Sequence, residues 1–452
     1  MKATQGLAAI ALVALTSVSL LAGAAVAPEQ ATRLRSELTP LGAERAGNAD
    51  GTIPAWHGGT TGAWPGYVSG RRRSDPFADE KPRLQITASN MAPYADKLSE
   101  GTQALLRRFP TYRLDVYPTH RTASAPQWVY DNTYRNATRA TTAHGGISVA
   151  GAYGGIPFPI PQNGHEAIWN HLLSWKGEAF RYDYSTYISM GEKPALSFMG
   201  TLETQYPYYY RNSSLDRFSG IHFLARVLTS EPPLRAGEQT VAHEPVDHFN
   251  DNRKAWQYLV GQRRARRAPE LNYDFPSFTT SGLSFVDETY LFNGPQDRYV
   301  WKLIGKREMF VPYNNNGFVN QKLEQVLGPH HLNPDHVRWE LHRVWVVEAT
   351  LAPGKRHAMP TRRFYLDEDT WQALLADGWD ANGQLWHTGY TLPVIIPEHP
   401  GVITAPFVIY DLVKRGYAAS SLFNERPRQY QAVPRRAEDY FSAAALAGEG
   451  VR

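Results

Sequence analysis

The sequence predicts an α+β fold that is mainly β, with a large, curved antiparallel sheet, helices packed into its concave face and an irregular N-terminal arm. Three observations support this prediction. Aromatic residues, which favour strands, are abundant: 25 Tyr, 18 Phe and 12 Trp. From residue 180 onward, apolar and polar residues alternate along several segments. Turn signals separate these segments in meander order, without a helical pattern between them.

The first 25 residues predict a secretory signal peptide. Lys2 precedes an apolar run from Gly6 to Leu21, small residues follow, and we expect cleavage after Ala25. No later stretch has the roughly 18 uninterrupted apolar residues that a membrane helix requires. We therefore expect a periplasmic protein with no transmembrane segment after signal removal. Because the chain has no cysteine, a lipid-modified cysteine at the cleavage site is excluded, and without that anchor we expect any contact with the outer membrane to be peripheral.

Composition excludes several classes of protein. The formal net charge is +4, and the basic residues are dispersed apart from residues 71–73 and 263–267, so a nucleic-acid partner is not expected. The absence of cysteine excludes disulfides and thiolate metal sites. With 42% hydrophobic and 20% charged residues, the chain is expected to be globular and held together by its core.

The pattern along the chain predicts four parts. Residues 1–25 form the signal peptide, and residues 26–110 form an N-terminal arm with short helices, in which residues 51–90 are rich in Gly and Pro. Residues 111–425 form the curved-sheet domain, and residues 426–452 form a C-terminal tail.

Strands are predicted where the period is two. Phe180, Tyr182 and Tyr184 alternate with polar residues, and residues 338–351 are apolar on both faces, which predicts a strand covered on both sides. Hairpin turns are expected around Gly294 and at residues 382–383. The remaining strands are expected within residues 202–210, 221–229, 298–313 and 362–374.

The sequence contains no motif that clearly indicates a catalytic or metal site. We find no nucleophile elbow, phosphate-binding loop or zinc-protease spacing, so no catalytic residue, metal or cofactor is predicted. "GNADGT" at residues 47–52 begins like a calcium loop, but Gly59 stands where a bidentate acid is needed, so an Asx turn is the better interpretation. Asp367 and Asp369 lie beside an aromatic residue and supply the acids for a less favoured hypothesis, a glycan or lipid hydrolase.

Four residues are candidates for ligand binding. Arg264 and Arg266 share one face of a predicted strand, where they would bind the phosphate or carboxylate head group of a ligand at the rim of a cavity. The alternative is that both arginines lie on the outer, solvent-exposed face and form ion pairs there. Trp339 and Trp345 lie on the apolar face of residues 338–351, toward a predicted apolar cavity.

Several sequence blocks together resemble the secreted Gram-negative domain of unknown function 1329 family. They include "LTPLGAERAGNADGTIPAWHGG", "GGIPFPIPQNGHEAIWNH", "WKLIGKREMFVPYNNN" and "RRFYLDEDTW", and the likeness extends from about residue 28 to about residue 425. The middle and C-terminal portion is similar to outer-membrane lipoprotein-sorting proteins. That resemblance implies an incomplete β-barrel whose helices cover an apolar cavity, and a periplasmic partner for an exporter of the resistance-nodulation-division type.

The functional prediction is a periplasmic carrier of a lipid or another hydrophobic molecule that serves an envelope transport system. A carrier needs only a cavity, because burial of a methylene contributes about 0.8 kcal/mol, so we do not expect an enzyme. The alternatives are an adaptor that docks on an exporter or outer-membrane protein through the N-terminal arm, and the hydrolase.

Overall fold

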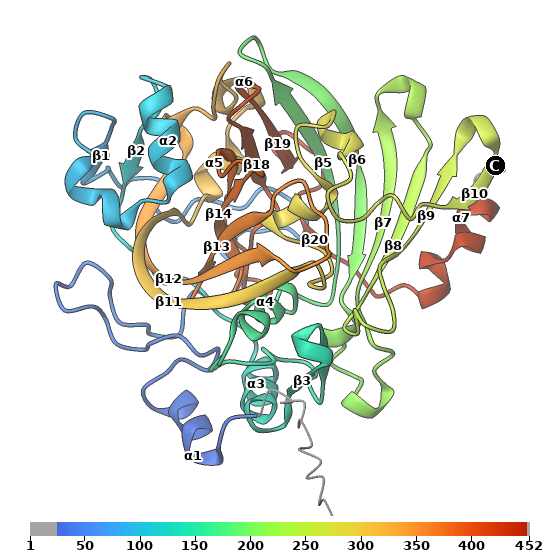
Figure 1. The fold of residues 1–452 in the computed structure, drawn as a ribbon, viewed down its shortest axis with the longest axis horizontal. Helices are drawn as coiled ribbons and strands as arrows, with labels where there is room; N and C mark the ends of the chain where they lie inside the picture. Colours follow the sequence, from blue (N-terminus) through green and yellow to red (C-terminus); the bar gives the residue numbers. More distant parts are fainter. Residues whose placement is uncertain (1–24, 450–452) are drawn as a thin grey trace, which may run out of the picture.

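The computed structural model describes residues 25–449, so the predicted signal peptide, apart from residue 25, lies outside the described residues. One large sheet of 16 strands dominates the molecule (Figure 1). Its hydrogen-bonded path begins at β1 and ends at β10, and no pairing between described residues joins these ends. The predicted mainly β fold with an incomplete barrel is therefore confirmed.

The strands follow the order β1-β2-β12-β13-β14-β15-β18-β19-β5-β6-β7-β8-β9-β10, while β11 pairs with β12 and β20 with β5. The pairs are antiparallel, except for the parallel contact between β2 and β12. The bounds are β1 Leu84–Ile86, β2 Leu114–Val116, β5 Ala179–Ser189, β6 Ala195–Gln205, β7 Ile221–Glu231, β8 Gln239–Pro245, β9 Lys254–Leu259, β10 Arg264–Arg267, β11 Tyr299–Pro312, β12 Arg338–Leu351, β13 Thr361–Asp367, β14 Ala373–Trp379, β15 Leu385–Thr391, β18 Phe407–Asp411, β19 Gly416–Leu422 and β20 Gln431–Ala432.

Two small sheets and several short helices complete the described residues. None of these helices combines the length and the apolar character needed to cross a bilayer. The small sheets are β3 Thr141–Ala143 with β4 Ser148–Ala150, and β16 Val394–Ile395 with β17 Val402–Ile403. The helices are α1 Pro28–Ala31, α2 Glu100–Arg108, α3 Gln127–Arg139, α4 Gly164–Leu172, α5 Asn316–Asn320, α6 Leu323–Val326 and α7 Ala443–Glu449.

Strands with a clear period were predicted correctly. Phe180, Tyr182 and Tyr184 are buried in β5, as their alternation indicates. The prediction for residues 338–351 is also confirmed, because β12 is buried on both faces along most of its length. One face carries apolar side chains such as Trp339, whereas the other includes the buried polar residue Glu340.

Two local predictions were wrong. The segment around Gly294 is not a hairpin, because it leads from a 3-10 helix, Val286–Leu291, into β11. Residues 362–374 form two strands, β13 and β14, because Asp367 accepts hydrogen bonds from Asp369 and Thr370 and closes a turn between them. The hairpin at residues 382–383 is confirmed: it joins β14 to β15, and Gly383 has the positive φ of 74° that the turn requires.

The concave and convex faces of the sheet are covered by different elements. Helix α4 lies on the concave side, against β11 and β12 (Figure 1). Its His171 and Leu172 line a small hollow together with Phe223 of β7. Helix α7 packs on the opposite face, where Leu446 contacts Val241 of β8. The expectation that helices cover the concave face is thus met by α4, and an irregular segment covers much of the rest.

That irregular segment, residues 268–298, is called the cover segment below. It connects β10, at one end of the strand path, to β11, which pairs with β12 near the other end. The chain must therefore cross the open side of the sheet, and Figure 1 shows it in yellow between these strands. This crossing places the cover segment over the space on the concave side of the sheet.

Candidate functional site

An apolar cavity of about 200 Å³ lies between the concave side of β5–β9 and the cover segment. Apolar side chains from adjacent strands form much of its wall, among them Leu202 of β6 and Phe223 and Val227 of β7. Phe278 and Tyr290 of the cover segment close it from the other side. The volume exceeds that of the engineered cavity of roughly 150 Å³ that binds benzene.

A row of three alanines explains why the cavity exists. Ala225 of β7 is paired in register with Ala242 of β8, and Ala242 is paired with Ala255 of β9. All three line the cavity. Directly opposed residues on neighbouring strands have side chains on the same face of the sheet. Because an alanine side chain is a single methyl group, the row leaves a trough across three strands.

Arg253, immediately before β9, fastens both ends of the cover segment. Its guanidinium forms an ion pair with Glu244 of β8, and the side chains are only 6% and 3% exposed. Its other nitrogens donate to the carbonyl oxygens of Leu271, at 3.2 Å, and Asn293, at 2.6 Å. Burial raises the pKa of Glu244, and the charge of Arg253 opposes that rise.

Asp287 makes a second buried attachment between the cover segment and the sheet. It accepts hydrogen bonds from Nη1 of Arg362 on β13, at 2.9 Å, and pairs with Nε2 of His357, at 3.0 Å. Burial alone would raise the pKa of Asp287, but the charges of Arg362 and His357 hold it well below its usual range. Arg362 also donates to the carbonyl oxygen of Leu291 at 3.2 Å.

Glu288 makes the third attachment. Its carboxylate lies 2.9 Å from Nδ1 of His387 on β15, and Nε2 of His387 lies 3.6 Å from Asp411. Burial alone would lower the pKa of His387, but the carboxylates of Glu288 and Asp411 raise it to about 9. The three attachments fix the middle and both ends of the cover segment over the cavity.

The cavity also presents polar groups to its interior. The hydroxyls of Thr186 on β5 and Ser420 on β19 line it, are buried, and have no hydrogen-bond partner among the described residues. Buried polar groups are normally satisfied. These two hydroxyls are therefore points where a ligand or water would form a hydrogen bond.

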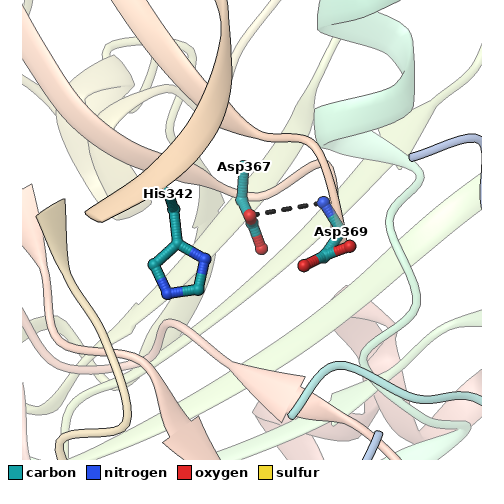
Figure 2. Close-up of side chains that lie close together, drawn as sticks. All are labelled: His342, Asp367 and Asp369. Carbon is teal, nitrogen blue, oxygen red and sulfur yellow. Dashed lines mark hydrogen bonds between the residues drawn. The ribbon is translucent and has the colours of Figure 1, made fainter. Parts of the chain in front are cut away.

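A separate buried cluster contains His342, Asp367 and Asp369 (Figure 2). Their potential ligand atoms all lie within 4.8 Å of one another. However, both oxygens of Asp369 accept hydrogen bonds from Arg121, at 2.6 and 2.9 Å, and Nε2 of His342 pairs with Glu340 at 2.9 Å. A guanidinium at this position repels a cation, so the geometry favours a structural polar network over a metal site.

The role of this network is to hold the N-terminal arm. Arg121 donates to the carbonyl oxygen of Glu44 at 2.7 Å, and Arg343 donates to that of Ala46 at 3.1 Å. Beyond these contacts, the amide of Thr52 donates to Asp50 at 3.0 Å, so residues 47–52 form the Asx turn that the sequence predicts.

Asp367 and Asp369 do not line the apolar cavity, and both are buried. Burial and the charge of Asp369 raise the pKa of Asp367 to about 6. Tyr313 and Thr370 donate to Asp367 at 2.9 and 2.7 Å. These bonds place both acids in the network that holds the arm. The expectation that the protein is not an enzyme stays a prediction.

The structure does not bring the four predicted ligand-binding residues together. Arg264 and Arg266 are exposed on β10, the edge strand, and Arg266 pairs with Glu270 at 3.0 Å. Trp339 is buried against Tyr390, and Trp345 stacks on Trp371. None of the four lines the apolar cavity. Their role in ligand binding stays a prediction.

An open β-barrel with an internal apolar cavity is the class of protein that this fold and site define. A family model, "Protein of unknown function (DUF1329)", matches residues 85–447. An uncharacterized protein of Pseudomonas aeruginosa is 39% identical over 461 residues, which cover 100% of each chain. The chain therefore belongs to the DUF1329 family, as the sequence blocks predict.

Solved structures show only distant similarity. A DUF1329 family protein of Desulfovibrio piger matches with 12% identity and a TM-score of 0.41, covering 60% of this chain and 92% of that one. A putative outer-membrane lipoprotein-sorting protein domain of Vibrio parahaemolyticus matches with 11% identity and a TM-score of 0.42, covering 62% and 97%. A LolA superfamily protein of Nitrosomonas europaea has 9% identity, a TM-score of 0.36 and coverages of 62% and 98%.

We expect Arg253→Met to lower the free energy of unfolding by about 3 to 5 kcal/mol, because it leaves Glu244 buried without a partner. The double variant Arg253→Met/Glu244→Leu removes both charges and should recover most of this loss. Arg33→Met, which breaks an exposed pair with Glu37, should cost less than about 1 kcal/mol. Urea denaturation measures all three, and equal losses in the single and double variants would contradict the prediction.

The attachment through His387 should depend on pH. Its pKa rises from 6.5 to about 9 on folding, so its stabilising contribution is complete below pH 6.5 and is lost as the pH rises through 9. The difference in unfolding free energy between the wild type and His387→Gln should therefore shrink over this range. His57→Gln, at an exposed site, serves as the control. A difference that stays constant with pH would rule out this attachment.

Proposed function

We propose that the protein binds and carries a lipid or another hydrophobic molecule in the cavity beneath the cover segment. The observation that carries this proposal is the row formed by Ala225, Ala242 and Ala255, which keeps open an apolar space that ordinary core side chains would fill. The cavity is lined largely by apolar side chains and offers a few convergent polar groups, which is the usual composition of a small-molecule site.

The volume of the cavity limits what fits without movement. At about 200 Å³, it is smaller than the roughly 300 to 1,000 Å³ typical of ligand pockets. A short acyl chain or a single ring suits this space, whereas a longer chain requires the cover segment to move outward. Such movement would break the buried attachments through Arg253 and Asp287, so the described position of the segment suits the shorter cargo.

Burial of the ligand supplies enough free energy for a carrier. Each methylene transferred from water contributes about 0.8 kcal/mol, so a chain of eight carbons gains at most roughly 6 kcal/mol before ordering costs. Binding of this strength is reversible, which a carrier requires. No chemical step is needed.

We further propose that the protein works in the periplasm, on the basis of the predicted signal peptide in residues 1–25. There it would serve an envelope transport system. The resemblance of its sequence blocks to the family supports a resistance-nodulation-division exporter or an outer-membrane protein as the partner. The N-terminal arm remains the proposed contact if the protein acts instead as an adaptor.

Native mass spectrometry of the protein purified gently from its own periplasm tests the carrier proposal. We expect a bound hydrophobic species in the wild type and its loss in Ala242→Phe, because the phenyl ring fills the centre of the trough. Ala195→Phe, at an exposed site on β6, adds the same volume elsewhere and should retain the ligand. An empty wild-type protein, or a ligand that survives in Ala242→Phe, would contradict the proposal.

A further inference from the structure

Lys176 is a cation without a counterion. Its Nζ donates to Oγ of Ser174 at 2.5 Å and to the carbonyl oxygen of His171 at 3.4 Å. Within residues 25–449, no carboxylate lies at ion-pair distance from Lys176. An ammonium has three N–H donors, so one remains unused. Burial lowers the pKa of Lys176 to about 7, which reflects the cost of holding this charge away from water.

His222 of β7 provides a second unused donor beside Lys176. Its side chain is buried, with 5% of its surface exposed, and its ring makes no hydrogen bond with a described residue. Lys176 and His222 both line a small hollow of about 30 Å³. A neutral imidazole carries one N–H, so His222 can donate one hydrogen bond into this hollow.

His171 forms a neutral wall of the same hollow. Its Nε2 lies 2.8 Å from the carbonyl oxygen of Phe292, and its Nδ1 accepts from the amide of Ala373 at 3.0 Å. Both ring nitrogens are therefore occupied, and burial lowers the pKa of His171 to about 3. The carboxylate that lines the apolar cavity, that of Glu244, is paired with Arg253. No acidic side chain of the described residues lines the hollow to neutralise Lys176.

The hollow adjoins the apolar cavity. Phe223, Tyr290 and Asn293 line both spaces. A water molecule needs roughly 10 to 15 Å³ of such volume, so 30 Å³ holds about two water-sized groups. The two oxygens of a carboxylate have this size. The arrangement is therefore a small basic end joined to a larger apolar space.

We infer that the cargo is an acidic amphiphile with a carboxylate head group. Lys176 and His222 bind the carboxylate, and the apolar part of the molecule lies in the trough made by the alanine row. The anion supplies the missing counterion of Lys176, so binding lowers the cost of a partly buried charge that has no carboxylate partner. This inference rests on the proposed carrier function and adds to it the chemical class of the cargo.

Calorimetric titration of the full mature chain with octanoic acid and with 1-octanol tests this inference. At about pH 6, a carboxylic acid is ionised and Lys176 is charged. We expect octanoate to bind at least about tenfold more tightly than octanol. Lys176→Met should lower octanoate affinity to the level of octanol and leave octanol binding unchanged. Lys302→Met, at an exposed lysine of β11, should change neither affinity.

The titration results distinguish failure of the carboxylate site from failure of the carrier function. Equal binding of octanol and octanoate by the wild type would overturn the carboxylate site and leave the carrier function standing. Binding of neither compound would overturn both proposals. Tighter binding of octyl phosphate than of octanoate would overturn the choice of head group. Circular dichroism checks that Lys176→Met folds. If Lys176→Met does not fold, Lys176→Gln replaces it in the titrations, because glutamine keeps a polar end but carries no charge.

Discussion

The structure depends on one constraint: an open sheet with an apolar concave face must cover that face. Because the strand path does not close, β5–β9 would otherwise expose their inward apolar side chains to water. The chain meets this constraint with the cover segment, residues 268–298, which spans the opening. An irregular segment cannot pair its backbone with the sheet along its length, so buried side chains of Arg253, Arg362 and His387 hold it in place.

Buried charged side chains also hold the N-terminal arm in place. Arg121 and Arg343 donate to backbone carbonyl oxygens of the arm, and their charges are balanced by Asp369 and Glu368. A chain without cysteine has no disulfides with which to fix such segments. Buried ion pairs contribute little net stability, but breaking one is costly, so they specify a single position for each segment. In this way the cavity keeps a defined shape.

The sequence predicts those parts of the fold in which local pattern and burial agree. The alternation of Phe180, Tyr182 and Tyr184, and the apolar faces of residues 338–351, identify β5 and β12 because a period of two is a local property. The family resemblance supplies the incomplete barrel. The cover segment was misjudged at Gly294 because it has no period, and its position depends on attachments to distant residues.

The cavity and the site at Lys176 could not be predicted from the sequence, because both depend on how distant segments are aligned by the fold. Ala225, Ala242 and Ala255 form a trough only because two strand registers align them, and register is not visible in one sequence. Lys176 is distinctive only because the fold leaves it without a carboxylate. The apolar face that carries Trp339 and Trp345 does not by itself locate this cavity, because large aromatic side chains fill a core as readily as they line a cavity, and neither residue lines it.

The position of a bound ligand tests the central claim most directly. A crystal structure of the protein with 8-bromooctanoic acid would locate the end of the chain by the anomalous signal of bromine. We expect the bromine in the trough beside Ala242, beneath the cover segment, and the carboxylate beside Lys176. Bromine on the outer surface of the sheet, or a cavity left empty at saturating ligand, would contradict the claim that this space is the binding site.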